Sequence, residues 1–177
     1  KCVLVLGDEF EIEEGKTLKN ILFEQLPYLQ EDNFLHFSKL NDKTNACDII
    51  EEELQAINIP AIYKKLAQIP FYTIISLGFD SLIERSFTEQ KFDYITDFYF
   101  KRQASTELSV PNKEIPLIYN LFGNIGKDES VVLSKDDVFD FLFSILGSYK
   151  LPKTITEQLQ KATNVIFLGC KYNTWQT

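Results

Sequence analysis

Short apolar runs alternate with amphipathic segments along almost the whole chain. The runs are apolar on both faces, which is typical of parallel strands buried inside a sheet. They span residues 3–6, 71–77, 115–121 and 165–169. Between them, helical spacing of apolar residues occurs over residues 18–26, 48–57, 61–69, 79–87 and 134–146, and Pro152 starts one more helix. Thr17 is available to cap the first of these helices, and Ser134 with Asp137 resembles a capping box. The pattern over residues 31–46 is irregular, and residues 92–100 are aromatic and β-prone. This order predicts an α/β fold, a doubly wound, Rossmann-like parallel sheet with helices on both faces.

The chain is long enough to bury one substantial core. It has 177 residues, of which 45% are hydrophobic, and no flexible linker divides it, so we expect a single domain over residues 1–177. The sequence contains no methionine, even at position 1, and stops soon after its last apolar run. We therefore expect a piece cut from a longer protein.

The net charge argues against two classes of partner. With 18 basic and 26 acidic side chains, the chain carries −8 at pH 7 and repels phosphate backbones and anionic lipid headgroups. No apolar run approaches the roughly 20 residues of a membrane helix, and the first residues do not form a signal peptide. We predict a cytoplasmic protein that binds neither nucleic acid nor a membrane.

Metal sites are not expected. Cys2, Cys47 and Cys170 are too scattered for a disulfide framework and form no CxxC pair for zinc, so reduced, mostly buried thiols are predicted. An acidic segment after the first apolar run could offer oxygens to Ca²⁺ or Mg²⁺, but it lacks the spacing of an EF-hand. Its members are Asp8, Glu9, Glu11, Glu13 and Glu14. Alternating charges here are more typical of a solvated strand or loop face.

Four strand ends carry motifs in a recognisable order. They read VLVLGDEFEIEEG, IISLGFDSLIE, PLIYNLFGN followed by VVLSKDDVFDFLFSIL, and VIFLGCKYNTW. Ligands of doubly wound proteins bind at such ends, here residues 7–11, 77–80, 122–124 and 169–174. In order and spacing the motifs resemble the compact sirtuin-like domains, which carry Gly-Ala-Gly-x-Ser, Thr-Asn-x-Asp, His-Gly and a late Gly-containing segment. The missing CxxC pairs imply that the zinc module of deacetylating sirtuins is absent.

The resemblance implies a domain that binds or consumes NAD, often within bacterial defence proteins. The positions that match its cofactor-binding motifs are Gly7, Asp8, Glu9, Asp80, Gly123 and Gly169. In the family, small residues of the first loop let backbone N–H groups approach the dinucleotide. Here Asp8, Glu9 and Glu11 replace Ala, Gly and Ser, and their repulsion of a pyrophosphate would weaken binding by more than about tenfold. We expect no bound cofactor.

The family's catalytic Asn and His are also replaced, by Gly78 and Phe122. Neither side chain can perform acid–base chemistry, so no catalytic residue is predicted. Phe122 is expected to fill the nicotinamide space with its ring. Asp80 is expected to cap the helix that begins near Ser81.

Other polar and aromatic residues near these ends are assigned structural roles. Asn120 and Asn124 flank Phe122 and Gly123 and are typical of turns. The only histidine, His36, lies between two apolar residues and is expected to be a packing residue.

A cluster of aromatic residues allows two interpretations. Phe98, Tyr99 and Phe100 could mark a partner surface, although core packing is favoured. Trp175 is expected to anchor the end of the sheet.

Three functions remain open at this point. The leading hypothesis is a catalytically degenerate module that acts by oligomerisation or by binding a protein partner, in a bacterial defence or signalling protein. An active NAD glycohydrolase, with NAD as cosubstrate, would need Asp80, Asn120, Asn124 or a first-loop carboxylate to replace the lost groups. A small-ligand sensor would use a strand-end crevice, whose acidic mouth suits a cationic ligand.

Overall fold

In the computed structural model, which describes residues 1–13, 15–39 and 41–171, a parallel sheet occupies the centre of the molecule. Within this part of the chain the sheet has five strands in the order β7-β8-β6-β1-β9. They are β1 (Cys2–Leu6), β6 (Thr73–Ser76), β7 (Ile95–Phe98), β8 (Leu117–Asn120) and β9 (Asn164–Leu168). The four predicted runs therefore form strands, and the β-prone segment 92–100 adds the edge strand β7.

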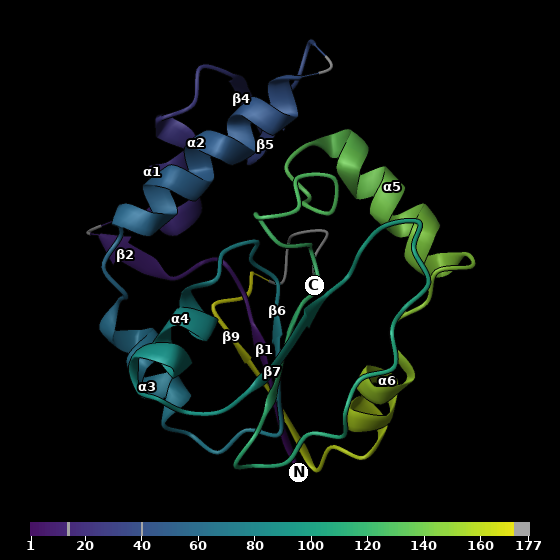
Figure 1. Ribbon diagram of the computed structural model, residues 1–177. Coiled ribbons are helices and arrows are strands. Elements are labelled where there is room, and N and C mark those ends of the chain that lie inside the picture. Colours follow the sequence, from purple (N-terminus) through teal and green to yellow (C-terminus); the bar gives the residue numbers. More distant parts are fainter. Residues whose placement is uncertain (14, 40, 172–177) are drawn as a thin grey trace.

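Helices cover both faces of the sheet (Figure 1). One face packs against α1 (Leu18–Glu24), α2 (Asp42–Ala56), α3 (Ala61–Ala67) and α4 (Leu82–Glu89), and the other against α5 (Lys135–Leu146) and α6 (Lys153–Gln160). Alternate strand residues serve the two layers: Leu4 and Ile74 face the first, whereas Val5 and Ile75 face the second. The predicted doubly wound fold is confirmed.

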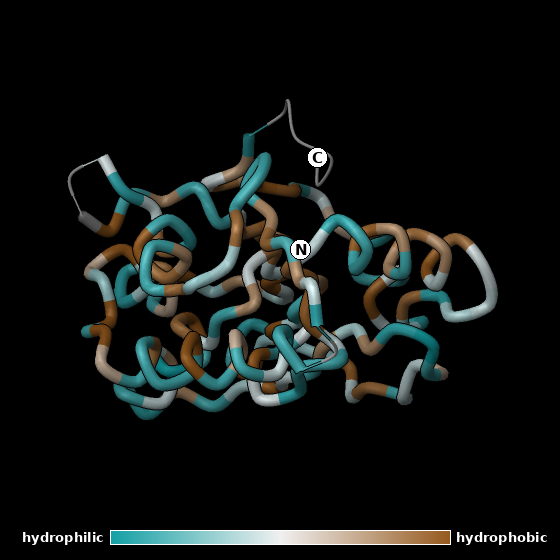
Figure 2. Tube along the Cα trace, turned by 90° about the horizontal axis from the view of Figure 1, so that it is seen from above, coloured by the Kyte–Doolittle hydropathy of each residue, from teal (hydrophilic) through white to brown (hydrophobic). Residues whose placement is uncertain are grey.

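The central strands are apolar on both sides because both sides are covered. β1 pairs with β6 and with β9, and β6 also pairs with β8, all in parallel register. Figure 2 shows hydrophobic segments in the middle of the molecule and many hydrophilic segments around them.

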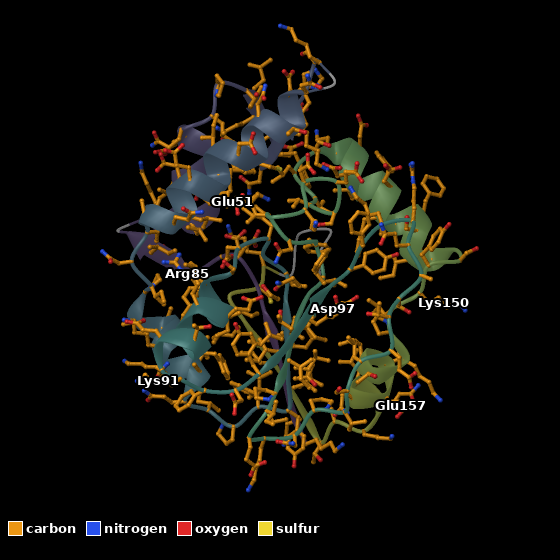
Figure 3. All side chains as sticks on the ribbon, in the orientation of Figure 1. Glu51, Arg85, Lys91, Asp97, Lys150 and Glu157 are labelled. Carbon is orange, nitrogen blue, oxygen red and sulfur yellow. The ribbon has the colours of Figure 1, made fainter. Side chains whose placement is uncertain are left out.

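Arg85 of α4 links two helices that lie on the same face of the sheet (Figure 3). Its guanidinium donates to the carbonyl oxygens of Leu54 at 2.6 Å and Ile57 at 3.0 Å, at the end of α2.

The segment 31–46, predicted to be irregular, is more ordered than expected. It forms part of a hairpin of β4 (Leu29–Glu31) and β5 (Phe34–His36), followed by the first turn of α2. Asp32 and Asn33 have φ values of 51° and 63°, the left-handed conformations that a two-residue hairpin turn requires. The prediction was wrong because this turn chemistry leaves no mark on the apolar spacing.

Two predicted helix starts are confirmed. The side chain of Thr17 accepts a hydrogen bond from the N–H of Asn20 at the start of α1, and Ser134 forms a capping box with Asp137 at the start of α5. The acidic segment forms β2 (Glu11–Glu13), which pairs with β3 (Lys16–Thr17), and Glu11 is exposed. A solvated strand face was predicted there.

The thiols and aromatic residues follow the sequence-based expectations only in part. Cys47 is buried, whereas Cys2 and Cys170 are half-buried. Tyr99 lies in the core with its hydroxyl donating to the Tyr149 carbonyl oxygen at 2.6 Å, as core packing predicts.

Glu14 and Trp175 lie outside the described residues. Of the helices described, none is both long and apolar enough to cross a membrane.

Candidate functional site

The candidate site lies where β6 and β8 end side by side. The chain leaves β6 into α4 on one face of the sheet and leaves β8 towards α5 on the other. Neighbouring strands that diverge in this way form the crevice in which doubly wound proteins bind ligands. Residues 77–80 and 121–124 therefore border the crevice, and residues 7–11 follow the next strand, β1.

Two glycines of the first and last motifs contact other parts of the chain. A Cβ atom on Gly7 would lie 2.1 Å from the carbonyl oxygen of Gly169. Gly169 has a φ of +68°, and a Cβ there would lie 2.6 Å from the ring of Phe10. The N–H groups of Gly7 and Glu9 donate to the carbonyl oxygens of Leu168 and Gly169. These two donors are therefore already bonded to protein, and a pyrophosphate would have to displace those bonds.

The first-loop carboxylates have basic partners. Asp8 lies 3.9 Å from the ammonium of Lys19, and Glu9 forms an ion pair with Lys171. Burial raises the pKa of Asp8, an effect that Lys19 opposes. The repulsion of a pyrophosphate was predicted from the carboxylates alone. The two lysines reduce this repulsion.

Asp80 is fully enclosed beneath Gly78. Its Oδ1 accepts a hydrogen bond from the N–H of Leu82 at 3.0 Å, at the start of α4, so the predicted capping role is confirmed. A Cβ on Gly78 would lie 2.5 Å from the other carboxylate oxygen. Burial raises the pKa of Asp80, and its hydrogen bonds to backbone N–H groups lower it less. The family's asparagine at position 78 would need this carboxylate to move.

Phe122 is buried directly after β8. Its side chain is 5% exposed, and its ring meets that of Phe141 on α5 edge to face, with centroids 5.1 Å apart. Gly123 follows with a φ of +91°, and a Cβ there would lie 2.3 Å from the carbonyl oxygen of Ser130. Gly7, Gly78 and Phe122 are all buried, so little of any of the three is open to solvent.

The sequence-based interpretation of Asn120 was wrong. Asn120 is the last residue of β8, is 0% exposed, and donates from Nδ2 to Glu84 Oε1 at 2.7 Å. Its side chain points to the helix layer of α4 because it follows Ile118 by two positions along the strand. Asn124 does form a turn, accepting the N–H of Gly126 through its side-chain oxygen at 3.0 Å.

Glu84 was missed by the sequence analysis, although it is a buried acid of the site with a raised pKa. Burial raises its pKa to about 7, and its hydrogen bond from Asn120 opposes that rise. Thr96 of β7 also lies 3.5 Å from Glu84 Oε1. Within the described residues, Glu84 Oε2 and Asn120 Oδ1 are buried without a hydrogen-bond partner. The sequence did contain one sign of this buried acid. Glu84 follows Ser81 by three positions and lies on the same face of an amphipathic helix as the apolar residues that become buried.

His36 is not a packing residue. It is exposed on β5 and lines a surface groove of about 270 Å³ between the hairpin and the start of α5, with Ser134 and Lys135. That groove includes neither Gly78, Asp80 nor Phe122 among its lining residues. The prediction failed because neighbouring residues of an extended chain point to opposite faces: Leu35 lies in the core and Phe37 packs against it, so His36 between them faces solvent.

One comparison with known proteins decides the family. The family model described as SIR2-like domain matches residues 72–177, more than half of the chain. This chain belongs to the SIR2-like domain family. No curated protein is similar enough to be matched to it. The matched region contains Gly78, Asp80, Glu84, Asn120 and Phe122, so the candidate site lies within the SIR2-like part.

The SIR2-like domain has no cluster of His, Cys, Asp and Glu that could hold a metal ion, as far as the described residues go. The residues expected to be remnants of a cofactor site lie around the carboxyl ends of the strands. Most of them contact other parts of the protein. Their assignment as vestigial NAD-binding residues stays a prediction.

The buried Glu84 makes the stability of this SIR2-like domain depend on pH. Because its pKa is about 7 in the folded chain and near 4.5 in the unfolded chain, the unfolded state loses its proton first as the pH rises. The contribution of Glu84 to the free energy of unfolding is therefore fully present below pH 4.5 and is lost as the pH rises through 7. At about 1.4 kcal/mol per pKa unit, the loss is on the order of 3 to 4 kcal/mol.

Urea unfolding of the parent and of Glu84→Gln at pH 5 and pH 8 measures this effect. The variant is expected to lose less stability between the two values than the parent, because its side chain cannot ionise. Glu89→Gln, an exposed change on the same helix, should keep the parent's pH dependence. An identical pH dependence in Glu84→Gln would contradict the assignment.

Proposed function

We propose that this SIR2-like domain does not hydrolyse NAD and serves as a protein-interaction module. The burial of Phe122 is the observation that carries the proposal. An apolar ring occupies the position of the family's proton acceptor and packs against Phe141 instead of facing a ligand. The bacterial defence or signalling setting implied by the resemblance belongs to this proposal too.

The neighbouring contacts support the same proposal. The N–H groups of Gly7 and Glu9 are bonded to the end of β9, and Phe10 covers Gly169. Asp80 is used as a helix cap beneath Gly78. A dinucleotide would have to displace these contacts before any catalytic group could reach its ribose.

The test is nicotinamide release from NAD by the purified chain, followed by chromatography. We expect release no faster than in a sample without protein, whereas an active sirtuin run in parallel shows that the assay works. Nicotinamide above that background would refute the proposal.

A second candidate function is an NAD glycohydrolase that uses Glu84. The observation that favours it is a carboxyl with a pKa of about 7, hydrogen-bonded to Asn120 at the ligand-binding edge of the sheet, as a general base requires. In this case the parent releases nicotinamide, Glu84→Gln abolishes the release, and Glu89→Gln preserves it. The burial of both Glu84 and Asn120 makes this the weaker candidate.

A further inference from the structure

Helix α5 has a broad apolar surface made of two adjacent faces. Its inner face, with Val138, Phe141 and Ile145, packs in the core against the sheet. Its outer face carries four large apolar side chains, which we call the outer stripe: Phe139, Leu142, Phe143 and Leu146. The polar residues Asp136, Asp137, Asp140 and Ser144 occupy the remaining side. The apolar surface of α5 is therefore wider than its packing on the sheet requires.

The outer stripe is exposed to solvent in the single chain. Its side chains are 61%, 37%, 80% and 81% exposed, in chain order. Positions i, i+3, i+4 and i+7 lie on one side of a helix, so the four form one continuous surface. Together they offer on the order of 400 Å² of apolar area, about half of what each partner contributes to an interface of standard size.

We propose that the outer stripe binds the outer stripe of a second copy of this chain, with the two α5 helices antiparallel. This inference rests on the proposed interaction role and names the partner. A two-fold axis between Leu142 and Phe143 makes the stripe complementary to itself. Phe139 of one copy then lies opposite Leu146 of the other, so that an aromatic ring always meets a leucine.

Charge favours the same antiparallel arrangement. Asp136 is exposed just before the stripe, and Lys150 is exposed just after α5 (Figure 3). Antiparallel helices bring each Asp136 near the Lys150 of the other copy, whereas parallel helices would bring like charges together. Lys135 lies at the same end of α5, but its charge is balanced by Glu31 and Asp32, at 2.9 and 3.0 Å. Between these two positions the charged side chains are Asp137, which is buried and paired with Lys43 and Lys101, and Asp140, which is paired with Arg102 at 2.8 Å. The centre of the interface is thus free of unpaired charge, although each copy carries −8 overall.

Sedimentation velocity of the full chain over a concentration series tests the proposal. We expect a dimer in the parent, and Leu146→Glu is expected to raise its dissociation constant by more than about tenfold. Leu29→Glu is the matched control, because Leu29 is 76% exposed on β4 and is not part of the outer stripe. Phe143→Asp serves as a second variant, and circular dichroism confirms that all three remain folded.

Each outcome decides the matter. A dimer in the parent and in Leu29→Glu, with monomers in Leu146→Glu and Phe143→Asp, supports the proposal. A monomeric parent, a dimer that survives both stripe variants, or equal loss in Leu29→Glu overturns it. The result is independent of the NAD assay, since a monomer that releases no nicotinamide refutes only the dimer, and a dimer that releases nicotinamide refutes only the proposed function.

Discussion

Replacing Asp137 by alanine is expected to lower the free energy of unfolding by about 3 to 5 kcal/mol, because two lysines lose the carboxylate that they share. Lys43 and Lys101 both donate to Asp137 Oδ1, at 2.5 and 2.7 Å. The other oxygen accepts the backbone N–H groups of Leu133 and Ser134 at 3.1 Å each. Burial would raise the pKa of Asp137, but the two ammonium groups outweigh burial and lower it.

The reason for so large an effect is the position of this group. Lys43 comes from α2, Lys101 follows β7, and Asp137 lies in the first turn of α5. The carboxylate therefore joins the two helix layers across the end of the sheet. Burial also lowers the pKa of Lys101, which shows that its ammonium depends on this partner. Without Asp137, two positive charges would lie close together in a poorly solvated place.

Urea unfolding of Asp137→Ala, with Asp140→Ala as control, measures the loss. Asp140 is on the same helix, but its ion pair with Arg102 is exposed, so the control should lose less than about 1 kcal/mol. Equal stability of the two variants would show that the buried lysines find other partners.

Truncation of Phe122 to alanine is expected to cost about 3 to 4 kcal/mol of unfolding free energy, the range for a well-packed aromatic ring. The ring belongs to the hydrophobic cluster that residues of β1, β6 and β8 form with α5. Its removal leaves a cavity beside Phe141. Phe122→His should also be less stable than the parent, since burial of a polar imidazole is unfavourable. It should not release nicotinamide from NAD.

Thermal melts of Phe122→Ala and Phe122→His test this packing role. Phe92→Ala is a suitable control because Phe92 is 43% exposed, and its loss of stability should be smaller. If Phe122→Ala had the same melting temperature as the parent, the ring would not fill the crevice. A gain of NAD hydrolysis in Phe122→His would instead show that the nicotinamide space is accessible.

The course of the sheet was predictable because strand burial leaves a local pattern. The runs that became β1, β6 and β8 are apolar on both faces, and a strand covered by helices on both sides must be so. The run that became β9 is also apolar, but it lies at the edge of the sheet with Val165, Ile166 and Phe167 exposed. Capping by Thr17, Asp80 and Ser134 was predictable for a similar reason, since a cap bonds within a few residues of its own position.

Pairing between distant side chains was not predictable. Lys19 and Lys171 moderate the charge of Asp8 and Glu9, and one of them is about 160 positions away from its partner. Asn120 was taken for a turn residue, because nothing beside it in the sequence indicates Glu84, which lies on a different element. Burial of Phe122 agreed with expectation, but its packing against Phe141 depends on how α5 returns to the sheet.

The sequence by itself determined the doubly wound fold and the helix caps, because periodicity and local hydrogen bonding are properties of short segments. Only the tertiary structure decided which charges are paired, which acid is buried and which face of α5 stays exposed. Those properties depend on residues far apart in the chain, whose distances are set by packing of the two helix layers on the sheet. The burial that raises the pKa of Glu84 to about 7 exists only in the assembled fold.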